Sequence, residues 1–250
     1  MPEHSEPGET ALPPSPAAGV VLVPTPIGNM ADITLRALEV LRSADWIACE
    51  DTRHTKHLLA HHGIDRPLVS FHEHNEAART AEIIRRVRNG ARIAVVSDAG
   101  MPGFSDPGLR LVHACRDQDV PCEVLPGPCA AVTALCGSGL PTDEFFFGGF
   151  LPVKRGARER TLRTALERES ATTVFYESPH RLDGTLDILA ALDPDRLVCA
   201  ARELTKKFET YHRGPAARVA EYFHQHPPRG EIVLLVAPRL LPKFMQPAAG

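Results

Sequence analysis

The segment RIAVVSDAGMPGFSDPG, residues 92–108, decides which fold we expect for this chain of 250 residues. It opens with an apolar run at Ile93–Val96, which is typical of a buried strand. A loop dense in Gly and Pro follows at once, and a helix is predicted from Pro107 to Gln118. Pro is favoured in the first turn of a helix, and we expect Asp106 before it to be the N-cap. A strand, a tight loop and a helix in this order form the repeating unit of a parallel sheet.

The same unit recurs on both sides of that segment. Strands are predicted at Val20–Val23, Trp46–Cys49, Leu68–Phe71, Ile93–Val96 and Cys122–Leu125. Helical stretches separate them, at residues 35–44, 52–62, 76–89 and 107–118. We therefore expect an N-terminal α/β domain over residues 19–126, with a five-stranded parallel sheet and helices on both of its faces.

Residues 127–238 follow a different pattern, which predicts a C-terminal domain with a mixed α/β sheet. Its strands are expected at Glu144–Phe147, Thr172–Tyr176, Leu197–Ala201, Lys207–Tyr211 and Ile232–Val236, with a turn at the GGF of residues 148–150. Only residues 202–206 separate the third strand from the fourth, which leaves no room for a crossover helix. These two strands are therefore expected to pair antiparallel. Residues 1–18, rich in Pro, and residues 239–250 are expected to be tails.

The composition excludes several classes of protein. The net charge of −3 argues against a protein that coats nucleic acid non-specifically, so no DNA partner is expected. No apolar run approaches the ~18–20 residues that cross a bilayer, and the first residues do not resemble a signal peptide. Six cysteines form no CxxC pair, which is typical of reduced thiols. We therefore expect a cytoplasmic protein with no membrane partner.

Three loops dense in Gly and Pro follow predicted strands of the first sheet. They are PTPIGN at 24–29, SDAGMPGFSDPG at 97–108 and LPGPCAA at 125–131. Ligands of open parallel sheets bind at the carboxyl ends of the strands, so these loops predict the ligand site. No GxGxxG, GxxxxGK[ST] or GxSxG motif is present, which argues against a dinucleotide, a phosphate loop or a serine hydrolase.

Polar clusters at other strand ends admit two interpretations each. Glu50, Asp51 and Arg53 could position a hydroxyl group, or Asp51 could simply cap the helix that begins near Thr52. The histidines within residues 54–62 and 72–74 suggest either a metal site or exposed surface. They are His54, His57, His61, His62, His72 and His74. We expect exposed surface, so no metal is predicted. A basic segment predicts contacts with RNA phosphates, or else a solvated helix face, through Lys154, Arg155, Arg158, Arg160 and Arg163.

Seven motifs occur in one order over residues 20–238: VPTPIGNMADIT, CEDTRHT, SDAGMPGFSDPG, LPGPCAA, FYESPHR, ARELTK and RGE. Together they resemble the tetrapyrrole-methylase superfamily. Within it they are similar to the branch that methylates the 2′-oxygen of a cytidine ribose in 16S ribosomal RNA of the small ribosomal subunit. The resemblance implies a homodimer of two-domain subunits, each with S-adenosylmethionine (SAM) in the cleft between its domains.

The resemblance also implies which residues bind the cofactor. They are Pro26, Ile27, Ala99, Gly100, Met101, Phe104, Cys129, Ala130, Tyr176, Ala200 and Ala201. One departure is Met101, which stands where the family usually has Thr. A Thr hydroxyl donates a hydrogen bond and a Met side chain does not, so a side-chain contact here would be lost.

Methyl transfer to a ribose requires that the hydroxyl group be positioned and lose its proton. The candidates for this work are Glu50, Asp51, Arg53, Glu203, Lys206 and Glu231, and the sequence does not rank them. Two other functions remain open. One is carbon methylation of a tetrapyrrole, and the other is a non-catalytic SAM-binding regulator in which Met101 marks a decayed site.

Overall fold

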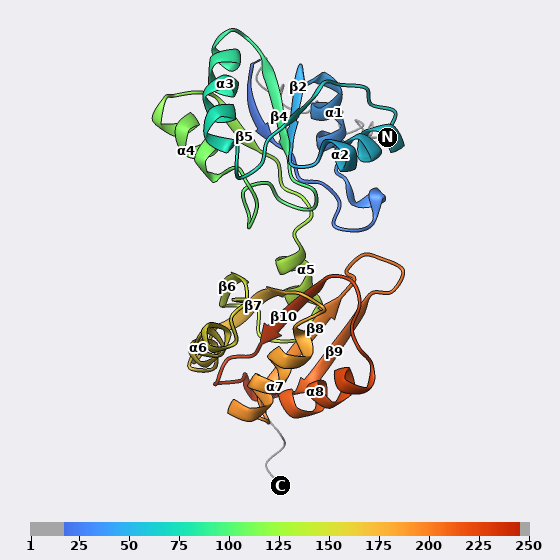
Figure 1. Ribbon diagram of the computed structural model, residues 1–250, viewed down its shortest axis with the longest axis vertical. Coiled ribbons are helices and arrows are strands. Elements are labelled where there is room, and N and C mark those ends of the chain that lie inside the picture. Colours follow the sequence, from blue (N-terminus) through green and yellow to red (C-terminus); the bar gives the residue numbers. More distant parts are fainter. Residues whose placement is uncertain (1–17, 246–250) are drawn as a thin grey trace, which may run out of the picture.

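A computed structural model describes residues 18–245, and its two five-stranded sheets lie one above the other along the long axis (Figure 1). Residues 1–17 and 246–250, which make up most of the first predicted tail and part of the second, lie outside the described residues. The predicted boundary at 126/127 falls between the last strand of the first sheet and α5 (Ala130–Gly137).

The first sheet is entirely parallel, with the strand order β3-β2-β4-β1-β5, as the alternation predicted. Its strands are β1 (Gly19–Leu22), β2 (Trp46–Cys49), β3 (Leu68–Ser70), β4 (Arg92–Val96) and β5 (Cys122–Val124). The helices of this half are η1 (Met30–Asp32), α1 (Leu35–Ser43), α2 (Thr52–His61), α3 (Glu76–Arg88) and α4 (Leu109–Asp117). Apolar side chains of α1 and α2 fill the core on one face, and those of α3 and α4 fill the other.

The prediction that Asp106 caps the fourth helix is wrong. Helix α4 begins at Leu109, and its N-cap is Gly108 with φ 141°. Before it the chain folds back in a tight turn, because the N–H of Gly103 donates to the Pro107 carbonyl at 3.1 Å. Asp106 therefore lies within this turn, three residues before the first residue of α4.

The second sheet is mixed, as predicted, with the order β6-β7-β10-β8-β9. Its strands are β6 (Phe145–Phe150), β7 (Thr172–Glu177), β8 (Leu197–Arg202), β9 (Thr210–Pro215) and β10 (Ile232–Val236). Its helices are α5, α6 (Arg155–Leu166), α7 (Leu182–Leu192), α8 (Ala216–Gln225) and η2 (Lys243–Met245). Side chains of α6, α7 and α8 fill the core on one face, and those of α5 pack on the other.

Two predictions for this half need correction. The GGF of residues 148–150 is no turn but the end of β6, where the pairing with β7 shifts register. Gly148 lies so close to the Phe175 ring that a Cβ would overlap it, which explains glycine within a strand. The strand expected at 207–211 begins at Thr210, because Glu203, Thr205 and Lys206 form a tight loop first. Its antiparallel pairing with β8 is confirmed.

Two further observations concern the length of the helices and the C-terminal end. Over residues 18–245, no helix is both long enough and apolar enough to span a bilayer.

At the end of the described chain, the N–H groups of Arg239 and Leu240 donate to the carbonyls of Arg168 and Glu169 at 2.9 and 2.8 Å.

Candidate functional site

A cavity of about 470 Å³ is lined by loops of the first sheet and by residues of the second. The loop after β4 contributes most of one wall, with Asp98, Ala99, Gly100, Met101, Phe104, Ser105 and Asp106. The loops after β1 and β2 add Ile27 and Glu50, and the segment that begins α5 adds Cys129 and Ala130. The second half adds Phe150, Tyr176, Glu177, Ser178, Pro179, Leu204, Gly230, Glu231, Ile232 and Val233. The cavity therefore lies at the carboxyl ends of the parallel strands, where such sheets bind ligands.

The three Gly/Pro-rich loops hold one another in place. Thr25 and Gly100 exchange two backbone hydrogen bonds of 3.0 Å, and the Thr25 hydroxyl donates to the Ser97 carbonyl at 3.1 Å. A Cβ at Gly127 would lie 2.5 Å from the Pro24 Cβ, so the third loop packs directly on the first. The backbone that faces the cavity is thus fixed by contacts among the loops themselves.

The first loop also touches the second half of the molecule. The N–H of Asn29 donates to the Thr205 hydroxyl at 3.1 Å. At Gly28 a Cβ would lie 2.5 Å from the Lys206 Cγ, so only glycine fits there without displacing the β8–β9 loop.

Eight of the predicted cofactor residues line the cavity: Ile27, Ala99, Gly100, Met101, Phe104, Cys129, Ala130 and Tyr176. Pro26 lines an adjoining pocket of about 230 Å³ instead. Ala200 and Ala201 do not line either cavity. Both lie buried in β8, where Ala200 packs in the core under α7 and α8 and Ala201 in the core beside α5.

Only two of the six predicted catalytic residues line the cavity. Glu50 and Glu231 line the cavity. Lys206 bridges two carboxylates, with its Nζ 2.9 Å from Glu203 Oε1 and 3.0 Å from Glu231 Oε2. These contacts hold the pKa of Glu203 below its ordinary value.

Asp51 and Arg53 line neither of these two pockets. Asp51 is the N-cap of α2, where its side chain accepts a hydrogen bond from the Arg53 N–H at 2.8 Å. Of the two roles considered for Asp51, the structure therefore shows the helix cap. The Arg53 guanidinium pairs with the same carboxylate at 2.9 Å. These hydrogen bonds lower the pKa of Asp51 to about 2, which makes it a poor proton acceptor at neutral pH.

Sequence reasoning missed three carboxylates in the cavity wall: Asp98, Asp106 and Glu177. Asp98 and Asp106 stand in the SDAG and SDPG parts of the loop that the sequence singled out, where attention went to the glycines. With Glu50 and Glu231 the wall carries five carboxylates, and none of its described residues is a Lys or an Arg. Burial, and then the negative charge of Glu50, raise the pKa of Asp106 to about 6.

Glu177 is the most enclosed of these carboxylates. Its Oε1 accepts from Arg181 Nη2 and from the Ser178 N–H, both at 2.7 Å, and its Oε2 accepts from the Thr185 hydroxyl at 2.7 Å. Its side chain is fully buried. The motif YESPHR therefore fixes the turn that brings Ser178 and Pro179 to the cavity.

Three aromatic side chains, Phe104, Phe150 and Tyr176, also line the cavity. Phe104 of the first half stacks on Phe147 of β6 with ring centroids 4.3 Å apart, and Phe147 and Phe150 each meet the Tyr176 ring edge-on. Burial raises the pKa of Tyr176 to about 12, so its hydroxyl stays protonated.

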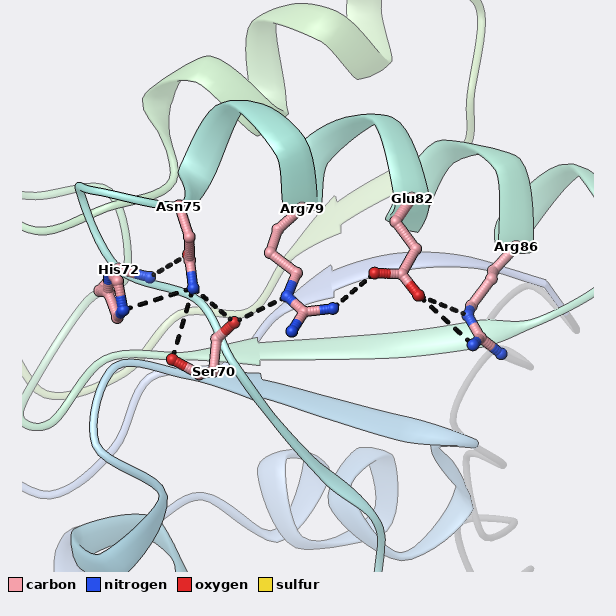
Figure 2. Close-up of polar contacts among 6 residues, drawn as sticks. All are labelled: Ser70, His72, Asn75, Arg79, Glu82 and Arg86. Atoms are coloured by element: carbon pink, nitrogen blue, oxygen red, sulfur yellow. Dashed lines mark hydrogen bonds and ion pairs between the residues drawn. The ribbon is translucent and has the colours of Figure 1, made fainter.

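The segment FHEHNE, residues 71–76, contains His72 and His74, which the sequence suggested for a metal or for exposed surface, and it anchors α3. Figure 2 shows polar contacts running from the end of β3 along that helix, where Asn75 Nδ2 and Arg79 Nε donate to the Ser70 carbonyl at 3.2 and 3.1 Å. They continue from Arg79 to Glu82 and from Glu82 to Arg86. In the described part of the chain, no group of three or more His, Cys, Asp or Glu side chains is placed to hold a metal.

The basic segment forms the start of α6. Lys154, Arg155 and Arg160 are exposed, and Arg163 is exposed but paired with Glu159 at 2.7 Å. The structure contradicts the predicted contact of Arg158 with RNA. Its side chain is only 7% exposed, and its Nη1 donates to the Val153 carbonyl. A helix face packed on the core buries every third or fourth residue, and Arg158 falls on that face with Leu162 and Ala165.

Comparison with known proteins agrees with this architecture. The family described as Tetrapyrrole (Corrin/Porphyrin) Methylases matches residues 19–220. A protein of Escherichia coli O157:H7 named ribosomal RNA small subunit methyltransferase I is 50% identical over 218 residues, 86% of this chain and 76% of that protein. The protein of the same name from Synechocystis sp. is 46% identical over 217 residues, 86% of this chain and 77% of that protein.

Solved structures give the same result. The uroporphyrin-III-C-methyltransferase of Thermus thermophilus is 26% identical, with a TM-score of 0.61 over 90% of this chain and 99% of that one. A diphthine synthase shares the fold at 14% identity, with a TM-score of 0.68 over 89% and 91% of the two chains. By its sequence and its fold, this chain belongs to the tetrapyrrole methylase family.

Proposed function

We propose that this protein transfers a methyl group from SAM to the 2′-oxygen of a cytidine ribose in 16S ribosomal RNA of the small ribosomal subunit. The observation that carries the methyl-donor part is the charge of the cavity. Five carboxylates and no Lys or Arg line it among the described residues, and three of them, Glu50, Asp98 and Asp106, form no ion pair within residues 18–245, which favours a ligand with positive charge. SAM carries two such charges, one on its sulfonium and one on its amino group, against one negative charge on its carboxylate, so its net charge is positive.

The walls of the cavity suit the rest of the cofactor. Ala99, Gly100 and Ala130 leave room for a ligand to approach the backbone, and Phe104 and Ile27 offer apolar surface to an adenine ring. We propose that the eight predicted cofactor residues in this wall contact SAM. Pro26, Ala200 and Ala201 stay outside that set.

When bound, SAM supplies an electrophilic methyl group on a positively charged sulfur. What remains for this chain is to hold the ribose hydroxyl in line with the methyl carbon and to accept its proton. Of the six predicted catalytic residues, Glu50 and Glu231 line the cavity, which supports the proposal that these two act on the hydroxyl or the sulfonium. Lys206 and Glu203 would act by holding Glu231.

The RNA substrate is supported by the names of the relatives and by the surface beside the cavity. Phe150 lines the cavity, and Lys154 and Arg155 follow it by four and five residues at the start of α6. With Arg160 they present three exposed cations that form no ion pair within residues 18–245. Such cations attract phosphates. Together with the family resemblance, this supports a folded RNA as the substrate. On the family resemblance alone, we also propose a homodimer as the acting form and the cytoplasm as its place.

One assay tests the proposal. Methyl-labelled SAM is offered with small ribosomal subunits, with free 16S RNA and with uroporphyrinogen. We expect label in RNA at the 2′-oxygen of a single cytidine, mapped by resistance of that linkage to alkaline hydrolysis. Label in the porphyrin would favour carbon methylation, and tight binding of SAM without any transfer would favour a regulator.

A further inference from the structure

We propose that Asp106 is a further catalytic residue, the base that takes the proton from the substrate hydroxyl. This inference rests on the proposed function, because it concerns the same cavity and the same transfer. Asp106 belongs to the loop after β4, and its placement depends on an unusual backbone.

The loop is built so that Asp106 turns into the cavity. Ser105 before it has a left-handed backbone, φ 64°, which few residues other than glycine adopt and which is often retained at functional sites. The turn is closed by the Gly103–Pro107 hydrogen bond and is held at its far end by Glu76, whose Oε1 accepts from the Gly108 N–H at 3.0 Å.

The charged groups around Asp106 leave its carboxylate free to act. Glu177 is occupied by Arg181, and Glu231 by Lys206. Within residues 18–245, Asp106 forms no ion pair; its polar partner is the Ser97 side chain. Two like charges face it from the first half, those of Glu50 and Asp98.

The remaining neighbours do not neutralise it. The Tyr176 phenol faces Asp106 from β7, and the His72 side chain faces Glu50. Asp98 accepts a hydrogen bond from the Asp51 N–H at 3.1 Å and is tied to the backbone in this way. A half-buried carboxylate between like charges holds a proton more readily than an exposed one. Its pKa of about 6 lies near the pH of the cell, as an efficient general base requires.

The step balances as a displacement. The hydroxyl oxygen forms a bond to the methyl carbon, the carbon–sulfur bond breaks with its electron pair going to sulfur, and the hydroxyl proton passes to an Oδ of Asp106. Because its pKa is below neutral pH, Asp106 then returns this proton to water.

The first test compares Asp106→Asn with Asp117→Asn, a matched change at an exposed position on α4. We expect Asp106→Asn to lower the single-turnover rate on small subunits by ~100-fold or more, the usual contribution of a general base. Its affinity for S-adenosylhomocysteine should stay within a few-fold of the wild type, and Asp117→Asn should behave as the wild type. A turnover rate near normal in Asp106→Asn would overturn the inference.

The second test moves the pKa of Asp106 without touching it. Glu50→Gln removes a repelling charge, so we expect the rise of rate with pH, which occurs near pH 6 in the wild type, to shift to lower pH. Carboxyl ¹³C NMR of the protein without cofactor should show one Asp titrating near pH 6, absent in Asp106→Asn and shifted down in Glu50→Gln. An Asp106 that titrates at its ordinary pH overturns this inference alone, whereas a wild type that methylates no RNA overturns the proposed function.

Discussion

The two sides of the cavity hold their carboxylates in opposite ways. On the first-sheet side, Glu50, Asp98 and Asp106 form no ion pair among the described residues. On the second-sheet side, Glu177 pairs with Arg181 and Glu231 with Lys206. Unpaired carboxylates repel one another and raise each other's pKa, whereas paired ones are fixed in place. The first side thus keeps carboxylates free to accept a proton and to attract a cation, and the second holds Glu177 and Glu231 in position at the cavity.

The largest effect is expected from breaking the paired side. Arg181→Met leaves the buried Glu177 carboxylate without its cation, and removal of one partner of a buried pair costs about 3 kcal/mol or more of folding free energy. Urea unfolding measures this loss. The double variant Glu177→Gln with Arg181→Met should recover a good part of it, and equal losses in the single and the double variant would show that the pair is not coupled.

The exposed cations outside the cavity should matter for RNA alone. Changing Lys154, Arg155 and Arg160 together to Gln is expected to weaken binding of small subunits by at least ~10-fold and to lower the slope of log affinity against log salt by about 2. SAM affinity should not change. Arg163→Gln serves as the control, since this side chain already pairs with Glu159, and an equal loss there would remove the case for a specific RNA surface.

The unpaired side should distinguish charged from neutral ligands. Asp98→Asn keeps the shape and the acceptor for the Asp51 N–H but removes one charge. We expect affinity for SAM to fall about tenfold, or ~1.4 kcal/mol, and affinity for the uncharged sulfur of S-adenosylhomocysteine to fall less. Calorimetry with both ligands measures this preference. The exposed Asp195→Asn is the control, and an identical loss for both ligands would contradict the charge argument.

The smallest effect is expected at Met101, which lines the cavity where the family usually has Thr. If that hydroxyl donates to the cofactor, Met101→Thr should tighten SAM binding about fivefold, since one hydrogen bond contributes ~1 kcal/mol. Unchanged affinity would show that the loop holds the cofactor through its backbone.

The pattern of the sequence was sufficient for the sheets but not for the cavity wall. Periodicity located the five strands of the first sheet to within a residue or two, because parallel strands are buried on both faces and read as apolar runs. The same reasoning misplaced Asp106, since a Pro at 107 looks like a helix start until the turn at Gly103 and Gly108 is known.

Contacts between distant segments explain the other errors. Gly148 continues a strand because the Phe175 ring lies beside it, and Arg158 is buried because α6 packs on the second sheet. In the sequence Glu177 is one of several polar side chains, and the structure shows that Arg181 and Thr185 both donate hydrogen bonds to it. The Phe175 ring and the sheet under α6 are distant in sequence from Gly148 and Arg158, so only the folded chain identifies them. Arg181 lies only four residues after Glu177, but the spacing alone does not show that this pair is buried.

The contact at Gly28 has a consequence for which substitutions the chain tolerates. Any side chain there would push against Lys206, and so against the loop that carries Leu204 into the cavity wall and holds Glu231. A substitution at Gly28, in the first loop of the N-terminal half, would therefore displace a loop of the C-terminal half. In a scan of all single substitutions, position 28 should group with the β8–β9 loop rather than with its neighbours in sequence.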